Sequence, residues 1–302
     1  MAKILKQSRF LILLTFIFVF PGCQDRLPGG DFQAIIISDV HVSNDQSKIN
    51  RLNLLIDRIN HNEFKKLKVL VVTGDIVSCV YGSHTQNNPD TSDNRIRKGW
   101  GVFSRSKVPV HFALGNHDYK IGRDRDSDSY FPEPEILMME RIWASQTGIK
   151  PYSINDYEGW NFIFLNSMRG SHLDRHFDDE QLLWLEQQLE NGKPTVLFFH
   201  HPLRTDHIRF WCGLKDLITP ENEPEFYRII AQYRKLIKGI FVGHGHAWVR
   251  DTLYDDIQVY ETNSFGDSNG LPFYQVGFLN SDSTIQVSRK NRTTYNARES
   301  EF

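Results

Sequence analysis

Short apolar runs, each bounded by polar or glycine residues, recur through most of the chain. Six of them predict strands, at residues 34–37, 69–72, 110–114, 162–165, 196–199 and 239–242. Each run has four or five residues and is rich in Val, Ile, Leu and Phe, a composition typical of strands buried on both faces of a sheet.

Helical patterns lie between these runs. Residues 52–59 place leucines and isoleucines at the i, i+3, i+4, i+7 spacing of one helix face. Asp178 and Gln181 have the spacing of a capping box and lead into a second apolar stripe at 182–189. Glu221–Leu236 is a third predicted helix. The alternation of strands and helices favours an α/β fold.

The pattern changes after His246. Residues 257–261, 273–279 and 284–288 alternate apolar and polar side chains, with turn signals between them, and so predict antiparallel strands. The segment 290–302 is polar, and we expect it to be a tail. The folded domain is therefore predicted to span residues 32–289.

The start of the chain predicts export. Residues 1–22 combine basic residues with an apolar segment at 10–20 that is too short to span a bilayer, as in a signal peptide. Cys23 follows Gly22, a context that resembles a bacterial lipoprotein processing site. We therefore expect Cys23 to be lipidated, residues 23–31 to act as a tether, and the protein to be membrane-anchored in the bacterial cell envelope. An ordinary cleaved signal peptide is the alternative.

Composition narrows the classes of partner. The chain has 302 residues, 40% of them hydrophobic, and a net charge of -2. Such a chain can bury a sizeable core, and it does not resemble a basic nucleic-acid binder, so no nucleic-acid polymer is expected as a partner. Cys79 and Cys212 are not in a metal-binding spacing; whether they form a disulfide is left open, as is the oligomeric state.

The candidate site residues, all polar, follow five of the six apolar runs within a few residues. Ligand sites in open α/β sheets form at the carboxyl ends of strands, so we expect these side chains to meet at one edge. His, Asp and an amide, without Cys, suit Zn, Mn or Fe as divalent ions. The residues are Asp39, His41, Asp75, Asn116, His117, Asp118, His200, His201, His244 and His246.

The number of these side chains predicts more than one metal ion. Seven or more ligands fit two octahedral-like ions that share a carboxylate, an arrangement suited to in-line displacement at phosphorus. Two divalent ions against only two carboxylates, Asp39 and Asp75, would leave a net positive site that attracts an anionic phosphoester.

The order D-x-H, G-D, G-N-H-D, H, G-H-x-H between Asp39 and His246 resembles the calcineurin-like metallophosphoesterase superfamily. The resemblance implies a four-layer α-β-β-α sandwich with two mixed β-sheets, and the late antiparallel strands would fit its second sheet. It also implies roles for the motif residues. Asp39, His41 and His246 would hold one metal, Asn116, His200 and His244 the other, and Asp75 would bridge them. His117 would face the leaving group, with Asp118 orienting it.

Other residues near the motifs have weaker assignments. Ser78 stands where purple acid phosphatases carry Tyr, which argues against that branch. Arg250 is a candidate to bind substrate, and His201 a candidate to support the ligands from behind. Trp248 would stack on a nucleobase or pack at the rim. The loop 122–129 lacks the spacing of a calcium loop and is predicted to be solvated.

The sequence therefore predicts a dinuclear-metal hydrolase. It would cleave a phosphodiester or phosphomonoester of a small molecule through in-line attack by hydroxide that the metals generate. One alternative is a degenerate envelope lipoprotein that binds phosphate or a nucleotide without turnover. A purely structural envelope lipoprotein is the other.

Overall fold

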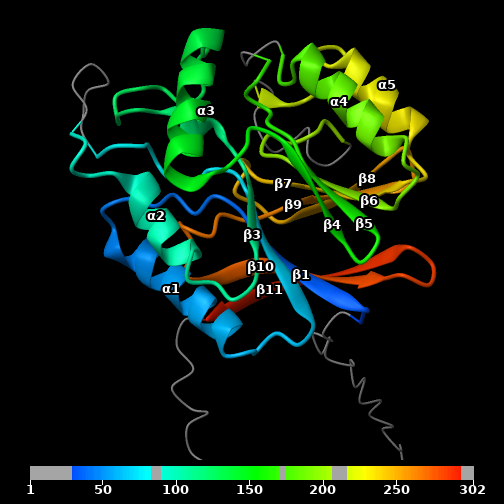
Figure 1. Cartoon of the computed structure of the whole chain (residues 1–302), viewed down its shortest axis with the longest axis horizontal. Helices are drawn as coiled ribbons and strands as arrows, with labels where there is room; N and C mark the ends of the chain where they lie inside the picture. Colours follow the sequence, from blue (N-terminus) through cyan, green and yellow to red (C-terminus); the bar gives the residue numbers. More distant parts are fainter. Residues whose placement is uncertain (1–28, 83–89, 171–174, 206–215, 294–302) are drawn as a thin grey trace, which may run out of the picture.

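Two β-sheets lie face to face, and helices cover their outer faces (Figure 1). The computed structural model describes residues 29–82, 90–170, 175–205 and 216–293. The predicted signal peptide, Cys23 and Cys212 lie outside these residues. Among the described residues, no helix is long and apolar enough to cross a membrane.

The five-stranded sheet has the order β11-β10-β1-β2-β3. The strands β1, β2 and β3 are parallel, whereas β10 runs antiparallel to both β1 and β11. The bounds are β1 Phe32–Ile37, β2 Leu67–Thr73, β3 Val110–Ala113, β10 Gly270–Leu279 and β11 Thr284–Thr293.

The six-stranded sheet has the order β4-β5-β6-β7-β9-β8. Its four central strands are parallel, and the edge strands β4 and β8 are antiparallel to their neighbours. The bounds are β4 Ser153–Tyr157, β5 Trp160–Phe164, β6 Thr195–Phe198, β7 Ile237–Val242, β8 Val249–Leu253 and β9 Ile257–Glu261.

Helices α1, α2 and α3 pack on the five-stranded sheet, and α4 and α5 on the six-stranded sheet (Figure 1). Their contacts form two of the three apolar cores, and the third lies between the sheets. Because strands such as β1 contribute alternate residues to two cores, they read as unbroken apolar runs. The bounds are α1 Gln46–Asn60, α2 Arg95–Phe103, α3 Glu133–Thr147, α4 Asp179–Leu189 and α5 Pro224–Gln232.

The structure shows the predicted α/β class and the α-β-β-α layers, but the placement of the late strands was wrong. The strands β10 and β11 join the first sheet rather than the second, because β10 pairs with the free edge of β1. The strand β9 runs parallel to β7, so it is antiparallel only to β8. The strand β11 also continues past Lys290 to Thr293, because these residues pair with the start of β10, so the predicted domain boundary after residue 289 falls inside a strand.

The predicted cap of α4 is half correct. Asp178 caps the helix by accepting a hydrogen bond from the Gln181 backbone N–H at 2.9 Å. The Gln181 side chain does not complete a capping box. It accepts from the backbone N–H of Asn166 at 2.7 Å and donates to the Asn166 carbonyl at 3.1 Å, and so ties the helix to the end of β5. The apolar pattern did not reveal the helices α2 and α3 or the edge strands β4 and β8.

Candidate metal centre

The seven predicted metal ligands lie where the carboxyl ends of strands from both sheets meet. The strands β1, β2 and β3 of one sheet, and β6 and β7 of the other, each deliver their first ligand two or three residues after the strand ends. The backbone ties these ends together, since His41 N–H donates to the Asp75 carbonyl at 2.9 Å and Gly243 N–H to the His200 carbonyl at 2.9 Å. We predicted that the ligands would meet at one edge of a single sheet. They meet instead where the ends of two sheets adjoin.

Three of the ligands form a first set, which we call group A: Asp39, His41 and His246. The Nε2 atoms of His41 and His246 lie 3.3 Å apart. Asp39 Oδ1 lies 3.2 Å from His246 Nε2 and 3.8 Å from His41 Nε2. Asp39 and His41 are buried, whereas 43% of the His246 side chain is exposed, so solvent reaches the group from the His246 side.

A second set, group B, consists of Asn116, His200 and His244. Asn116 Oδ1 lies 3.0 Å from His200 Nε2 and 3.3 Å from His244 Nδ1. Asp75 lies between the two groups, because its Oδ2 is 3.7 Å from His41 Nε2 in group A and 3.3 Å from His200 Nε2 in group B. Asp75 is therefore close to both groups, and that it bridges two metals stays a prediction.

Five of the seven predicted ligands have a backbone conformation that is unusual outside glycine. Their φ angles lie between 49° and 72°, in the left-handed region, for Asp39, His41, Asp75, His244 and His246. A side chain in this region costs energy and persists only where the surroundings enforce it. Such strain concentrated at strand ends is typical of functional sites.

Glycines next to the ligands make room for the site. A Cβ atom at Gly74, whose φ is +98°, would lie 2.3 Å from His200 Nδ1. A Cβ atom at Gly115 would lie 2.3 Å from Asp75 Oδ1. The glycines of the G-D and G-N-H-D motifs are therefore required because another ligand occupies the space that their side chains would take.

The donor set fits a divalent cation. Asp39 Oδ1 is buried and receives no hydrogen bond from the described residues. His200 Nδ1 lies 2.9 Å from the Thr73 carbonyl, which only accepts, so Nδ1 carries a proton and neutral His200 turns the lone pair of Nε2 inward. That lone pair meets Asn116 Oδ1 and Asp75 Oδ2, which are also acceptors. Converging acceptors of this kind require a positive charge among them.

In the protein without bound metal, protons on the histidines supply part of that positive charge. Burial lowers the pKa of His200, but the charges of Asp75 and Asp39 and the hydrogen bonds to Asp75 and Thr73 together outweigh this effect and raise the pKa to about 10. Burial lowers the pKa of His41 to about 4, so that its imidazole is neutral at pH 7 and keeps a lone pair for a metal. Metal binding would therefore have to displace a proton from His200.

The structure corrects the role that we expected for Asp118. Its carboxylate accepts hydrogen bonds from the backbone N–H groups of Gly115, at 2.9 Å, and Val77, at 3.0 Å, and forms no hydrogen bond with the His117 ring. The ring is held instead by Ser78, whose carbonyl lies 3.0 Å from His117 Nδ1. Burial and the charge of Asp75 raise the pKa of Asp118 to about 8. Asp118 therefore shapes the turn, and Ser78 orients the imidazole.

His117 lies beside the ligands and is half-buried. Its ring packs edge-on against His41 with centroids 4.7 Å apart, and its backbone N–H donates to Asp75 Oδ1 at 2.9 Å. Because the Ser78 carbonyl only accepts, Nδ1 carries a proton and Nε2 is left to exchange a second one. His117, His41 and Asp75 also have ligand atoms close enough together to hold a metal, so geometry alone does not restrict His117 to acid–base chemistry.

The structure does not bring Arg250 to the ligands. Its Nε donates to Gln258 at 3.2 Å, and its guanidinium lies over the Tyr260 ring. Trp248 packs against Tyr274 with ring centroids 4.8 Å apart, in agreement with the packing alternative. His201 packs behind group B, with its ring centroid 4.8 Å from that of His244.

Sequence reasoning missed two carboxylates beside group B. Asn116 Nδ2 donates a hydrogen bond to Asp128 Oδ1 at 2.9 Å, although we expected the loop that carries Asp128 to be only solvated. His244 Nε2 lies 3.4 Å from Asp216 Oδ2. Aspartates are common in loops, so only their distance to a ligand in the folded chain identifies these two.

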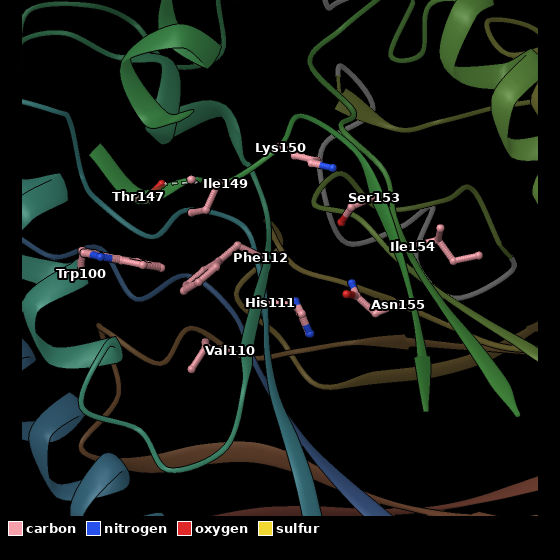
Figure 2. A pocket seen from close by; sticks show the side chains of 11 residues that line it. Trp100, Val110, His111, Phe112, Thr147, Ile149, Lys150, Ser153, Ile154 and Asn155 are labelled. Carbon is pink, nitrogen blue, oxygen red and sulfur yellow. Dashed lines mark hydrogen bonds between the residues drawn. The ribbon is translucent and has the colours of Figure 1, made fainter. Parts of the chain in front are cut away.

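A cavity of about 260 Å³ opens elsewhere, between the edge strands β3 and β4. Figure 2 shows His111 of β3 and Asn155 of β4 among its lining side chains. None of its lining residues is a carboxylate or a predicted ligand, so this cavity is separate from the candidate metal centre.

The fold and the site together define a phosphoesterase class. Residues 32–248 match the family model described as calcineurin-like phosphoesterase. The match covers well over half of the chain, and the chain belongs to this family. It is therefore a metal-dependent phosphoester hydrolase.

Individual relatives agree with this class. A "probable cyclic nucleotide phosphodiesterase" of Fibrobacter succinogenes is 28% identical over 238 residues, which are 76% of this chain and 77% of that protein. One of Psychrobacter sp. with the same description is 26% identical over 243 residues, 74% of this chain but only 63% of the relative. A dimetal phosphatase of Danio rerio shares the fold, with a TM-score of 0.59 at 13% identity over 86% of this chain and 99% of that one.

Proposed function

We propose that the protein is a dinuclear phosphodiesterase that acts on small phosphodiesters, with cyclic nucleotides as the leading substrate class. The observation that carries the proposal is the division of the predicted ligands into groups A and B with Asp75 between them. Two divalent cations, Mn, Fe or Zn, would suit this set of donors. The descriptions of the Psychrobacter and Fibrobacter relatives support the choice of cyclic nucleotides.

Bound cations would supply positive charge for the phosphate group and would lower the pKa of a nearby water. The residues of the chain supply orientation and a proton. A water molecule releases one proton to solvent and its oxygen adds to phosphorus in line, the bond to the leaving oxygen breaks, and His117 donates a proton to that oxygen. The Ser78 carbonyl holds the ring so that Nε2 is the nitrogen available for this transfer.

The charge balance favours diesters over monoesters. We had counted two carboxylates against two divalent cations, but the structure adds Asp128 and Asp216 beside the ligands, so four carboxylates balance four positive charges. Among the described residues, no Lys or Arg forms a hydrogen bond or an ion pair with a predicted ligand. A nearly neutral site is better suited to a diester with one negative charge than to a monoester with nearly two.

The test is metal-dependent hydrolysis by the purified protein. The protein is stripped with a chelator and then titrated with Mn²⁺ while bis(p-nitrophenyl) phosphate, p-nitrophenyl phosphate and a 3′,5′-cyclic nucleotide are assayed separately. We expect Mn²⁺ to restore hydrolysis, with the diesters turned over faster than the monoester. A preference for the monoester would contradict the diester assignment. Bound Mn²⁺ without hydrolysis of any substrate would favour a binding protein without turnover.

A further inference from the structure

We propose that Asp128 and Asp216 are positioning residues that aim two group B side chains at the metal, and that neither binds the metal itself. The inference rests on the proposed metal centre and adds two residues to it that belong to none of its sequence motifs. Both carboxylates contact the side of a ligand that faces away from the other ligands.

Asp128 determines which way the Asn116 amide faces. An ionised carboxylate accepts hydrogen bonds but cannot donate them, so the amide edge at 2.9 Å from Asp128 Oδ1 must be the NH₂ group. The amide oxygen then points to His200 and His244, where it can serve as a ligand. Without Asp128 the amide would be free to rotate and present hydrogens to a cation.

The loop that carries Asp128 is ordered by its own contacts. The Asp128 backbone N–H donates to Asp126 Oδ1 at 3.1 Å, and Ser127 Oγ donates to Asp128 Oδ1 at 3.1 Å. Arg125 lies over the Phe131 ring at 4.4 Å and donates to the Tyr130 carbonyl at 2.7 Å. These contacts hold the turn in place, so the Asp128 carboxylate lies on an ordered turn beside Asn116.

Asp216 determines the tautomer of His244. The carboxylate oxygen at 3.4 Å from Nε2 stabilises a proton on that nitrogen, which leaves Nδ1 with its lone pair facing Asn116 Oδ1. Asp216 is 6% exposed, so this contact is shielded from water. His200 has the same arrangement, with the Thr73 carbonyl as its acceptor. Every group B ligand therefore has an acceptor behind it.

Group A lacks an equivalent arrangement at its exposed histidine. His246 Nδ1 lies 4.0 Å from Asp267 Oδ2, which is too long for a hydrogen bond, and Asp267 is engaged by Lys48 at 2.6 Å. Removing Asp128 or Asp216 should therefore weaken one metal site and spare the other.

The experiment measures Mn²⁺ binding by calorimetry and by metal analysis of the protein after gel filtration. Asp216→Ala and Asp128→Ala should each weaken one of two Mn²⁺ sites by about 10- to 100-fold, the usual effect of losing a partner behind a ligand. Asp216→Asn and Asp128→Asn should retain most of the affinity, because an amide oxygen can still face His244 Nε2–H or accept from the Asn116 NH₂ group. Asp124→Ala is the control, since it removes the same charge from an exposed position in the same loop as Asp128.

The Asn and Ala variants distinguish two effects of Asp128 and Asp216: orientation of the ligand side chains and negative charge near the metal. If the Asn variants lose as much affinity as the Ala variants, or if both metal sites weaken equally in variants with a native circular dichroism spectrum, the proposal is overturned. Variants that match the wild type at both sites would overturn it as well. A wild-type protein that binds two Mn²⁺ ions but hydrolyses nothing would overturn only the proposed function, whereas one that binds fewer than two would overturn both.

Discussion

Asn116, His117 and Asp118 are consecutive residues whose side chains have three different sets of partners. They lie in a single 3₁₀ turn, η1 Asn116–Tyr119, in which successive side chains point about 120° apart. Asn116 faces the group B histidines, His117 contacts Ser78, and Asp118 accepts backbone hydrogen bonds inside the turn. The tight turn lets one short motif supply a predicted ligand, a proposed proton donor and a structural carboxyl.

His117→Ala tests the proton donor at this scale. We expect the variant to lose about 100-fold or more in kcat for a diester with a poor leaving group and much less for a p-nitrophenyl ester, because only a poor leaving group needs the proton. Stopped assays with both substrates and metal analysis of the variant measure the effect. Equal losses for the two substrates would argue against the acid role, and a loss of bound metal would make His117 a ligand.

At the scale of elements, buried polar side chains join parts that the strand and helix pattern treats separately. Asn166, after β5, donates to Tyr119 of η1 at 2.6 Å and to Glu140 of α3 at 2.9 Å. Gln181 of α4 binds the Asn166 backbone. This network connects helices on both outer faces to the turn that carries the G-N-H-D motif.

Glu140 makes the stability of this network depend on pH. Burial raises the pKa of Glu140 from 4.5 to about 7, even though Arg169 opposes the shift. The folded state therefore binds the proton more tightly than the unfolded state, and the stabilisation is present below pH 4.5 and lost as pH rises through 7. Since each tenfold change in proton affinity is worth about 1.4 kcal/mol, the effect is on the order of 3 kcal/mol.

Glu140→Gln tests this pH dependence because glutamine stays neutral at every pH. Urea unfolding at pH 5 and at pH 8 should show the variant gaining stability relative to the wild type as pH rises. Glu133→Gln, at an exposed position on the same helix, is the control and should show no such trend. A stability difference between Glu140→Gln and the wild type that is the same at both pH values would contradict the assignment.

At the scale of the whole molecule, the candidate metal centre belongs to neither sheet alone. Its residues follow β1, β2 and β3 in one sheet and β6 and β7 in the other. The centre therefore forms only when the two sheets pack against each other through the core that contains Phe32, Phe162 and Phe198. Access from outside is on the side of His246, His244 and His117, which are the most exposed of the residues in the sequence motifs of the site.

We propose that the protein is anchored in the cell envelope through Cys23, on the basis of the leader-like residues 1–22. Mass spectrometry of the protein from membranes should find diacylglycerol on Cys23 as the first residue of the mature chain. Cys23→Ala should abolish labelling by a fatty-acid probe without affecting hydrolysis. An unmodified N-terminus in the wild-type protein would contradict this prediction.

The sequence alone was enough to predict most of the strands, except the edge strands β4 and β8, and which polar side chains follow them, whereas the layers of the fold came from the family resemblance. The strands and the side chains after them are predicted from short stretches of sequence. An apolar run of four or five residues indicates a strand that is buried on both faces, and the next few residues must lie at the end of that strand. Asp39, His41 and Asp75 are predicted in this way, and that they bind metal stays a prediction.

Only the tertiary structure decided which groups face one another. The sheet that β10 joins depends on which strand edge is free, and alternation in β10 is the same in either sheet. The hydrogen-bond partner of His117 Nδ1 is a backbone carbonyl. Every residue has such a group, so the sequence does not indicate which one binds His117. Asp128 and Asp216 are ordinary loop aspartates until folding brings them within reach of Asn116 and His244, because contacts between distant segments are set by packing and not by local pattern.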